Sequence, residues 1–307
     1  MSTILICFLI LLYTFQSFFG RKYTDNYPGD PNDASDVLTV VYGLVVAIIS
    51  MMFSGFVFEF NYITLLFGIA NAVALIGYNA FLVKASQTGS YSIMMVFNLS
   101  GGIVIPAIVS VFFGDRLSII QILSILLIFV SVYMLSKKQE DVKNSAIFFV
   151  FCAMLAVCNG TYGALLNAQQ KITSVEQKEE MVLYTFMISS IVALLTLIAK
   201  RKKGTIKAFK QTKKSFVYVV ACAIVAALAI NLLVIILEII ESPTLLYTFD
   251  NAGVMLMSFL ISAIIFKEKI TKTNVVGCIL MCIGLITISL FNVEATDKLF
   301  MVIKNIF

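Results

Sequence analysis

One acidic side chain stands inside a long apolar run near the end of the chain. Asp250 lies within 243–266, and Tyr247, Asn251 and Val254 fall beside it at the spacing of one helix face. A charged group in an apolar medium is unfavourable, so such a residue has to face protein or water. This face therefore predicts a carboxylate that holds a cation or takes up a proton. The alternatives are a carboxylate near the membrane interface and one that is simply hydrogen-bonded to a neighbouring helix.

Amides and tyrosines recur at helical spacing in other apolar runs. A single Asn or Gln in such a run is usually a hydrogen-bonding contact between helices. Taken together, they predict a polar and uncharged lining, in which tyrosine rings stack on a planar group or face a cation. The residues are Tyr13 and Gln16 in 2–19, Asn71, Tyr78 and Asn79 in 62–83, Asn98 in 91–113, Asn159, Tyr162 and Gln169 in 144–170, and Asn231 in 216–237.

The composition indicates the medium in which these side chains lie. Of the 307 residues, 60% are hydrophobic and only 13% are charged, and the mean hydropathy is +1.00. Apolar runs of about 18 residues or more are long enough to cross a bilayer as helices. We therefore predict an all-α integral membrane protein with ten transmembrane helices. The runs are 2–19, 37–57, 62–83, 91–113, 118–135, 144–170, 180–199, 216–237, 243–266 and 271–292.

Basic residues gather in alternate loops. The loops after the first, third, fifth, seventh and ninth runs carry 17 of the 22 lysines and arginines, and the segment 200–215 dominates this number. The positive-inside rule predicts that these loops are cytoplasmic, which puts both termini outside. We expect a multi-pass protein of the cell (plasma) membrane in contact with the lipid bilayer.

The two halves of the chain resemble each other. At an offset of 153 residues, F-G-D-R-L-S at 113–118 lies over F-K-E-K-I-T at 266–271. The other matches are Asn98 with Asn251 at the same offset, and Tyr13 with Tyr162 and Lys22 with Lys171 at an offset of 149. Their order and near-constant spacing predict a duplication, with repeats at 1–138 and 139–293 and a tail at 294–307.

The repeated motif has a structural interpretation. Ser118 has a glutamine three residues later, which is a helix-capping pattern, and Thr271 with an asparagine is a weaker copy. Asp115 and Glu268 then lie beside helix N-termini, where negative charge is favourable. We interpret both acids as turn and cap residues, not as catalytic carboxylates.

Each repeat contains five predicted helices, and an odd number of crossings inverts the second copy relative to the first. Inverted repeats are typical of secondary transporters, which open one site alternately to the two sides of a membrane. The ten-helix pattern and the two motifs also resemble the EamA-type branch of the drug/metabolite transporter superfamily. The resemblance implies two inverted five-helix repeats around a cavity lined mainly by helices 1, 3, 4, 6, 8 and 9. It also implies cytoplasmic termini, in contrast to the charge count.

The predicted function is a secondary transporter of a small polar or cationic metabolite, driven by protons or by exchange. Histidine is absent and the chain has no Walker A loop, so imidazole chemistry and ATP as the energy source are excluded. We expect no cofactor, no metal and no nucleic-acid partner, in a monomer or homodimer. Two alternatives stay open: a membrane partner or sensor that transports nothing, and a membrane enzyme acting on lipid-linked substrates.

Overall fold

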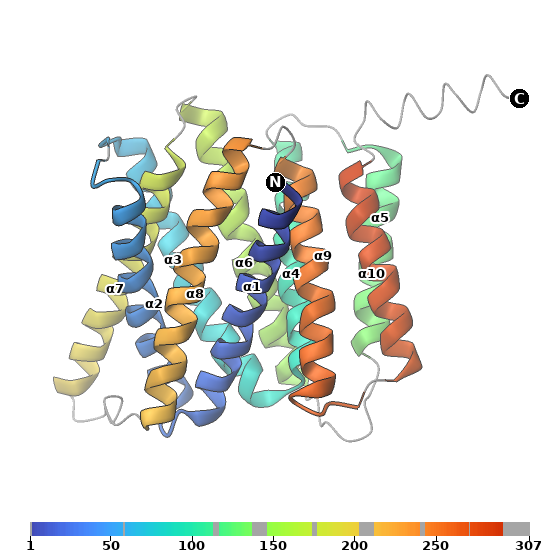
Figure 1. The fold of residues 1–307 in the computed structure, drawn as a ribbon, viewed down its shortest axis with the longest axis horizontal. Helices are drawn as coiled ribbons and strands as arrows, with labels where there is room; N and C mark the ends of the chain where they lie inside the picture. The colour runs from blue at the N-terminus through green and yellow to red at the C-terminus, as the bar shows by residue number, and fades with distance from the viewer. Residues whose placement is uncertain are drawn as a thin grey trace, which may run out of the picture.

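The computed structural model describes residues 2–57, 59–112, 117–136, 146–173, 177–202, 212–239, 243–269 and 271–290. Within these ranges the chain forms ten α-helices and no strand, which confirms the predicted all-helical class (Figure 1). The helices are α1 (Ser2–Asn26), α2 (Pro31–Phe53), α3 (Tyr62–Thr88), α4 (Tyr91–Phe112), α5 (Ile119–Ser136), α6 (Ala146–Thr173), α7 (Lys178–Lys202), α8 (Lys213–Ile239), α9 (Pro243–Ile264) and α10 (Lys272–Leu290).

The helices begin where the sequence offers caps. Asp30 accepts a hydrogen bond from the N–H of Asn32 at 2.8 Å, and Pro31 occupies the first position of α2, where no N–H is needed. The side chain of Asn61 caps α3 by accepting the N–H of Ile63 at 2.8 Å. These caps satisfy donors that the first helical turn leaves open.

Both predicted capping patterns are confirmed. At the start of α5, Ser118 Oγ accepts the N–H of Gln121 at 3.1 Å and the Gln121 side chain accepts the N–H of Ser118 at 3.0 Å. At the start of α10, Thr271 and Asn274 exchange the same two bonds at 3.2 and 3.0 Å. The reciprocal geometry fixes where each of these helices begins.

Glu268 does not cap α10, contrary to the prediction. Its carboxylate turns to the N-terminus of α4, where it accepts the N–H of Tyr91 at 2.6 Å. The preceding residue, Lys267, has a φ of 55°, a left-handed conformation that reverses the chain after α9. This turn directs the Glu268 side chain away from its own helix. Asp115, its counterpart in the first repeat, lies outside the described residues.

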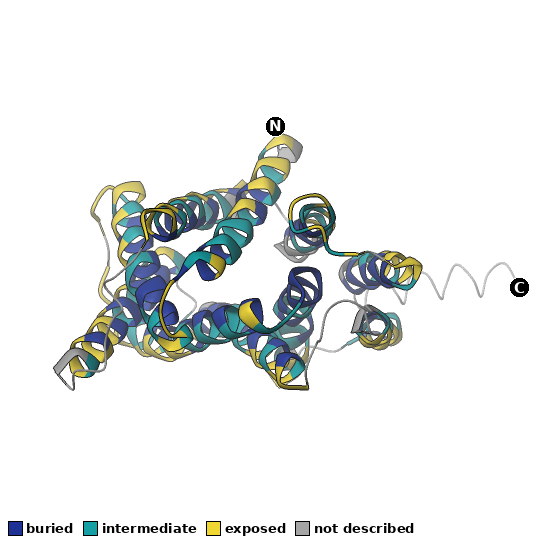
Figure 2. Ribbon diagram, turned by 90° about the horizontal axis from the view of Figure 1, so that it is seen from below, coloured by how far each residue is buried: buried dark blue, intermediate teal, exposed yellow. Residues whose placement is uncertain are grey.

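Seven described helices are long and apolar enough to cross a membrane. The apolar parts of α5, α9 and α10 within the described residues are shorter, at 10–17 residues. Large apolar side chains cover the outer surface, as with Phe112 at 84% exposed and Val73 at 67% (Figure 2 shows the exposed residues in yellow). An apolar exterior of this extent suits a lipid environment and not water.

The bundle is built from a small set of close helix pairs. Helix α1 packs along α8 and α9, α2 along α7 and α8, α3 along α6 and α7, and α4 along α6 and α9. Helices α5 and α10 pack on each other at one edge (right side of Figure 1). The two largest apolar cores lie mainly among α4, α5, α6, α9 and α10, and mainly among α1, α2, α3, α7 and α8. Tyr78 of α3 packs against both cores.

The contact between α4 and α6 depends on glycine. A Cβ at Gly101 would lie 2.3 Å from the carbonyl oxygen of Ala156, and a Cβ at Gly160 would lie 2.4 Å from the carbonyl oxygen of Gly101. Small residues of this kind let two helix backbones approach closely in a membrane. The approach brings the polar residues of α4 and α6 within reach of each other.

An ion-pair cluster joins α2 to α7 at the lower end of Figure 1. Lys200 Nζ lies 2.6 Å from Asp36 Oδ2 and 3.2 Å from Asp33 Oδ1. The first residue of the basic segment 200–215 is therefore held by acids of α2. The rest of that segment lies largely outside the described residues.

Candidate functional site

A hydrogen bond between α1 and α2 marks one end of a polar region inside the bundle. Gln16 Nε2 donates to the hydroxyl of Tyr42 at 2.8 Å, and Gln16 Oε1 is buried without a hydrogen-bond partner. The thiol of Cys222, on α8, donates to the Gln16 carbonyl at 3.3 Å. Tyr13 and Tyr162 lie close enough to Tyr42 to interact with it electrostatically. This part of the region combines tyrosine hydroxyls with one amide.

A second set of bonds continues through α3, α4 and α6. Asn98 Nδ2 donates to the hydroxyl of Tyr78 at 3.3 Å, and the Asn98 carbonyl accepts from Asn159 Nδ2 at 2.8 Å. Next to them, a Cβ at Gly102 would lie 2.9 Å from Asn159 Nδ2 and 3.8 Å from Asn251 Oδ1. Gly102 thus leaves space between two amides from α6 and α9. Tyr78 also lies near Tyr42, which links the two sets.

We refer to Gln16, Tyr42, Tyr78, Asn98, Asn159 and Asn251 as the tyrosine–amide chain. Its members come from α1, α2, α3, α4, α6 and α9. The side-chain amides of Gln16 and Asn98 each donate to a tyrosine hydroxyl. The oxygen of each amide, Gln16 Oε1 and Asn98 Oδ1, is buried and has no hydrogen-bond partner. Buried polar groups in proteins are nearly always hydrogen-bonded. The open atoms are therefore suited to contact a bound polar molecule.

Asp250 directly precedes Asn251, the α9 member of the tyrosine–amide chain, and lies on the side of α9 that faces α1. It is 5% exposed, and its Oδ1 atom has no hydrogen-bond partner among the described residues. One turn before it, Leu246 packs in a cluster with Leu9, and one turn after it, a Cβ at Gly253 would touch Ile10 at 2.5 Å. A carboxylate in apolar surroundings is stabilised by a proton or by a cationic donor.

Two other predicted residues occupy contacts between helices. Asn79 donates to Thr39 at 3.1 Å, which joins α3 to α2. Asn231 donates to Ser50 at 3.1 Å, which joins α8 to α2. The structure thus brings these two amides to helix contacts and not to the tyrosine–amide chain.

Gln169 and Asn71 lie in the other half of α3 and α6. Gln169 Nε2 donates to Thr64 at 3.1 Å, and Thr64 donates to Gln177 at 2.6 Å, so that α3 is bonded to α6 and to the start of α7. Asn71 is fully buried with both amide atoms unpartnered. Of Tyr247, only the backbone lies within the described part of the chain.

Tyr42 was not predicted. It lies in the run 37–57, which contains no amide and no other tyrosine to draw attention to it. Its partner Gln16 is 26 residues earlier on another helix. Only the packing of α1 beside α2 reveals the pair.

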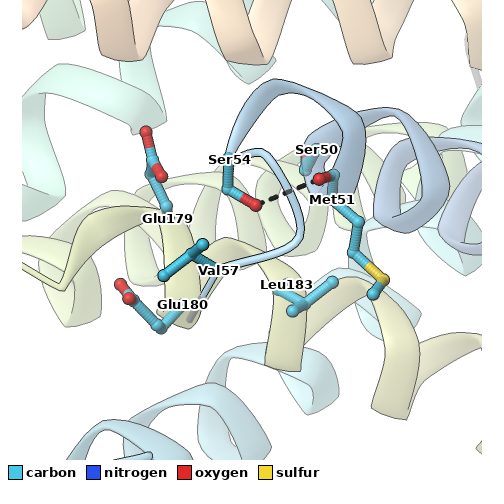
Figure 3. Close-up of a pocket in the computed structure, with 7 residues that line it drawn as sticks. All are labelled: Ser50, Met51, Ser54, Val57, Glu179, Glu180 and Leu183. Carbon is cyan, nitrogen blue, oxygen red and sulfur yellow. Dashed lines mark hydrogen bonds between the residues drawn. The ribbon is translucent and has the colours of Figure 1, made fainter. Parts of the chain in front are cut away.

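A separate shallow pocket lies where α2 ends and α7 begins (Figure 3). Ser50, Met51, Ser54, Val57, Glu179, Glu180 and Leu183 line it. The two acids stand on one side, and Ser54 donates to the carbonyl of Met51 at 3.1 Å. Across the described residues, no group of three or more histidines, cysteines and acids could hold a metal ion.

Comparisons with known proteins agree with this architecture. The model of the EamA-like transporter family matches residues 144–290. A solved crystal structure of a protein is similar to the chain with a TM-score of 0.58 and 15% sequence identity, over 94% of this chain and 96% of the other. At that identity the likeness shows the fold alone. No curated protein matches the chain. Residues 144–290 therefore form an EamA-like domain of the drug/metabolite transporter superfamily.

Proposed function

We propose that this chain is a secondary transporter that moves a small polar or cationic metabolite across the cell membrane by alternating access. The observation that carries the proposal is the tyrosine–amide chain, which crosses six helices inside the bundle beside Asp250, whose buried Oδ1 atom has no hydrogen-bond partner among the described residues. Polar and ionisable residues in this position typically mark a substrate or ion pathway. Transport requires binding and release only, so the absence of histidine is no obstacle.

The packing of the helices supports an inverted repeat. A shift of five helices turns the pair α1·α8 into α6·α3, the pair α1·α9 into α6·α4, and the pair α2·α8 into α7·α3, and all six pairs are in contact. The pairs α2·α7, α4·α9 and α5·α10 map onto themselves. A pseudo-two-fold axis in the membrane plane would produce this exchange, and alternating access follows from such symmetry.

Asp250 is proposed to take up the coupling proton or the cationic group of the substrate. The described residues offer its Oδ1 no hydrogen bond, so either partner would remove an unfavourable buried acceptor. Tyrosine rings nearby would accommodate a cation or a planar group. Amides of the tyrosine–amide chain would bind the polar part of the substrate.

Uptake by proteoliposomes tests the proposal. The purified chain is reconstituted, a proton gradient is imposed, and uptake of labelled putrescine, choline, L-serine, uracil and succinate is measured. We expect saturable uptake of at least one cationic or neutral probe and none of succinate. The absence of uptake for every cationic and neutral probe would contradict a transport function and favour a sensor or an enzyme.

The variant Asp250→Asn should reduce gradient-driven uptake of the accepted probe at least roughly tenfold, the size of loss expected for one interaction of a charged group. A loss confined to gradient-driven uptake, with exchange retained, would assign Asp250 to the proton. A loss of both would assign it to the substrate. Glu59→Gln removes an exposed acid outside the bundle and serves as the control. Full activity of Asp250→Asn would rule out both roles.

A further inference from the structure

The carboxylate of Glu268 is surrounded by hydrogen-bond donors from the start of α4. Oε1 accepts the N–H of Tyr91 at 2.6 Å. Oε2 accepts the hydroxyl of Ser90 at 2.7 Å, and the N–H and hydroxyl of Ser92 at 3.2 and 2.8 Å. Ser262, in the last turns of α9, donates to Oε2 as well. A side chain from the second half of the chain thus caps a helix of the first half.

The charge of Glu268 suits this position. The N-terminus of a helix carries a partial positive charge, and hydrogen bonds to an ionised carboxylate are about twice as strong as neutral ones. Burial alone would raise the pKa of Glu268, but the donors from Ser262, Ser90, Tyr91 and Ser92 outweigh it and hold the pKa below its usual value. The side chain is therefore ionised at neutral pH, and protonation does not release it there.

Aromatic and basic residues close the same end of the bundle. The ring of Phe266 lies 5.0 Å from the ring of Tyr91 and 6.1 Å from that of Phe18. Lys22 Nζ lies 4.8 Å above the Phe266 ring, and the Arg21 guanidinium 5.7 Å. The end of α1 and the connection between α9 and α10 are thus packed together over the start of α4 (lower end of Figure 1).

Arg21 adds a bond to the connection between α3 and α4. Its Nη1 donates to the carbonyl of Gly89 at 3.1 Å, and its Nε lies 3.1 Å from Asp25 of the same helix. We refer to Arg21, Ser90, Ser92, Phe266 and Glu268 as the latch. It joins α1, α4 and the connection after α9, and Gln16, Asn98 and Asn251 lie on α1, α4 and α9 themselves.

The opposite end of the bundle is held differently. Gln169, Thr64 and Gln177 form neutral hydrogen bonds there, between 2.6 and 3.1 Å, that join α3 to α6 and to the start of α7. The contrast with the ionised Glu268 is a difference in strength, because charge-assisted bonds exceed neutral ones. The bonds to Glu268 should therefore hold the latch end more strongly than these neutral bonds hold the other end.

We infer that Glu268 is a positioning residue of the transport cycle, which keeps the latch end closed by holding the N-terminus of α4 and must let it go when that end opens. Asn98 lies seven residues beyond Tyr91, about 10 Å along α4, so a movement of the helix start reaches the tyrosine–amide chain. This inference rests on the proposed transport function. It goes beyond that function in naming the residue that sets which end is closed.

Distance measurement in the full chain tests the inference without a substrate. Spin labels are placed on cysteines at Gln87, at the end of α3, and Lys272, at the start of α10, both of which are exposed. The native cysteines are replaced first, and the resulting background is checked for folding. With Glu268 present, we expect a single narrow distance distribution between the labels.

Glu268→Gln keeps the size of the side chain and removes its charge. We expect it to raise the open-to-closed ratio roughly tenfold to hundredfold, the range for losing hydrogen bonds to a charged group, and to add a longer distance. Ser90→Ala with Ser92→Ala keeps Glu268 but removes two of its donors, and should act in the same direction. Glu180→Gln removes an acid at the other end and should leave the distances unchanged.

The two proposals can fail independently. An unchanged distance distribution in Glu268→Gln and in the double serine variant would overturn the latch, whatever the transport result. Absence of uptake for every probe by the unmodified chain would overturn the transport function. If both variants unfold, the melting temperatures of Glu268→Asp and of the single serine variants decide: equal stability to the parent would also overturn the latch.

Discussion

Asp250 and Glu268 are acids of the same chain in opposite surroundings. The Oδ1 atom of Asp250 has no hydrogen-bond partner in the described structure, whereas both oxygens of Glu268 accept hydrogen bonds from α4. A carboxylate that lacks donors gains from a proton or a ligand, and one that is saturated with donors gains nothing further. Asp250 is therefore suited to change its state during a cycle, while Glu268 is suited to hold a structure.

The pH dependence of stability should show how much the ionised Glu268 stabilises the folded chain. Its pKa is lowered in the folded chain relative to the ordinary value of 4.5. The unfolded chain therefore binds the proton first, so the stabilisation is complete above about pH 4.5 and is lost as the pH falls through the folded pKa. Unfolding in detergent between pH 7 and pH 3 measures this. The parent chain should lose more stability on acidification than Glu268→Gln.

The charged neighbours of Glu268 do not produce this difference. Arg21 and Lys22 of α1, and Lys267 and Lys269 beside Glu268, are present in both chains and cancel in the comparison. Asp25, which pairs with Arg21, is likewise present in both chains and cancels. Equal acid sensitivity of the parent and Glu268→Gln would contradict the assignment.

At the scale of elements, the α4–α6 contact sets the position of Asn98 relative to Asn159. Gly101→Ala would bring a Cβ to within 2.6 Å of backbone atoms of Ala156, which cannot move as a side-chain tip would. We expect a loss of about 1–3 kcal/mol in the free energy of unfolding, the usual range for overpacking. Thermal unfolding in detergent provides the measurement.

The matched control for that variant is Gly163→Ala in α6. A Cβ there would lie 3.5 Å from Pro106 Cγ, an ordinary contact, and alanine favours a helix more than glycine does. We expect unchanged or slightly higher stability. A larger loss in Gly163→Ala than in Gly101→Ala would contradict the close-contact interpretation of the α4–α6 pair.

At the scale of the whole molecule, the proposed transport cycle predicts that the latch end separates while α5 and α10 stay together. The test replaces Tyr91 and Phe266 with cysteines in a background without other cysteines, and joins the two with a short cleavable thiol reagent. Cross-linking should reduce uptake of the accepted probe at least roughly tenfold. Reduction of the cross-link should restore it. Tyr91 keeps its backbone N–H in this variant, so the bond to Glu268 is retained. Uptake that survives complete cross-linking would contradict the movement of this end.

The control pair is Ser124 and Thr287, whose hydroxyl oxygens are 2.7 Å apart across α5 and α10. These helices also share the bond from Gln121 to the Ile288 carbonyl at 3.0 Å and pack at the edge of the bundle. Cross-linking them should leave uptake unchanged. A loss there equal to that of the latch pair would mean that cross-linking itself harms the protein.

Much of the fold follows from local patterns in the chain. Apolar runs long enough to span a bilayer predict helices, because backbone groups in lipid must bond within the segment, and each of the ten helices overlaps one predicted run. The capping residues Ser118 and Thr271 predict helix starts for an equally local reason. The motif match also places Gly114 at the position of Lys267, whose positive φ is the conformation that glycine adopts most readily.

The partners of the polar side chains depend on tertiary packing. Helical spacing places Asn71, Tyr78 and Asn79 on related faces of one helix, yet Asn79 bonds to α2 while Tyr78 bonds to Asn98 of α4. Tyr42 has no local signal at all, and the role of Glu268 at α4 depends on residues more than 170 positions away. The amino-acid sequence by itself determined that the protein lies in a membrane, where its helices are and that polar groups are buried among them. These features depend on composition and short-range spacing. Which of those groups meet was decided only in the folded bundle, because a hydrogen bond between helices depends on their rotation and depth, and neither is encoded in a single run.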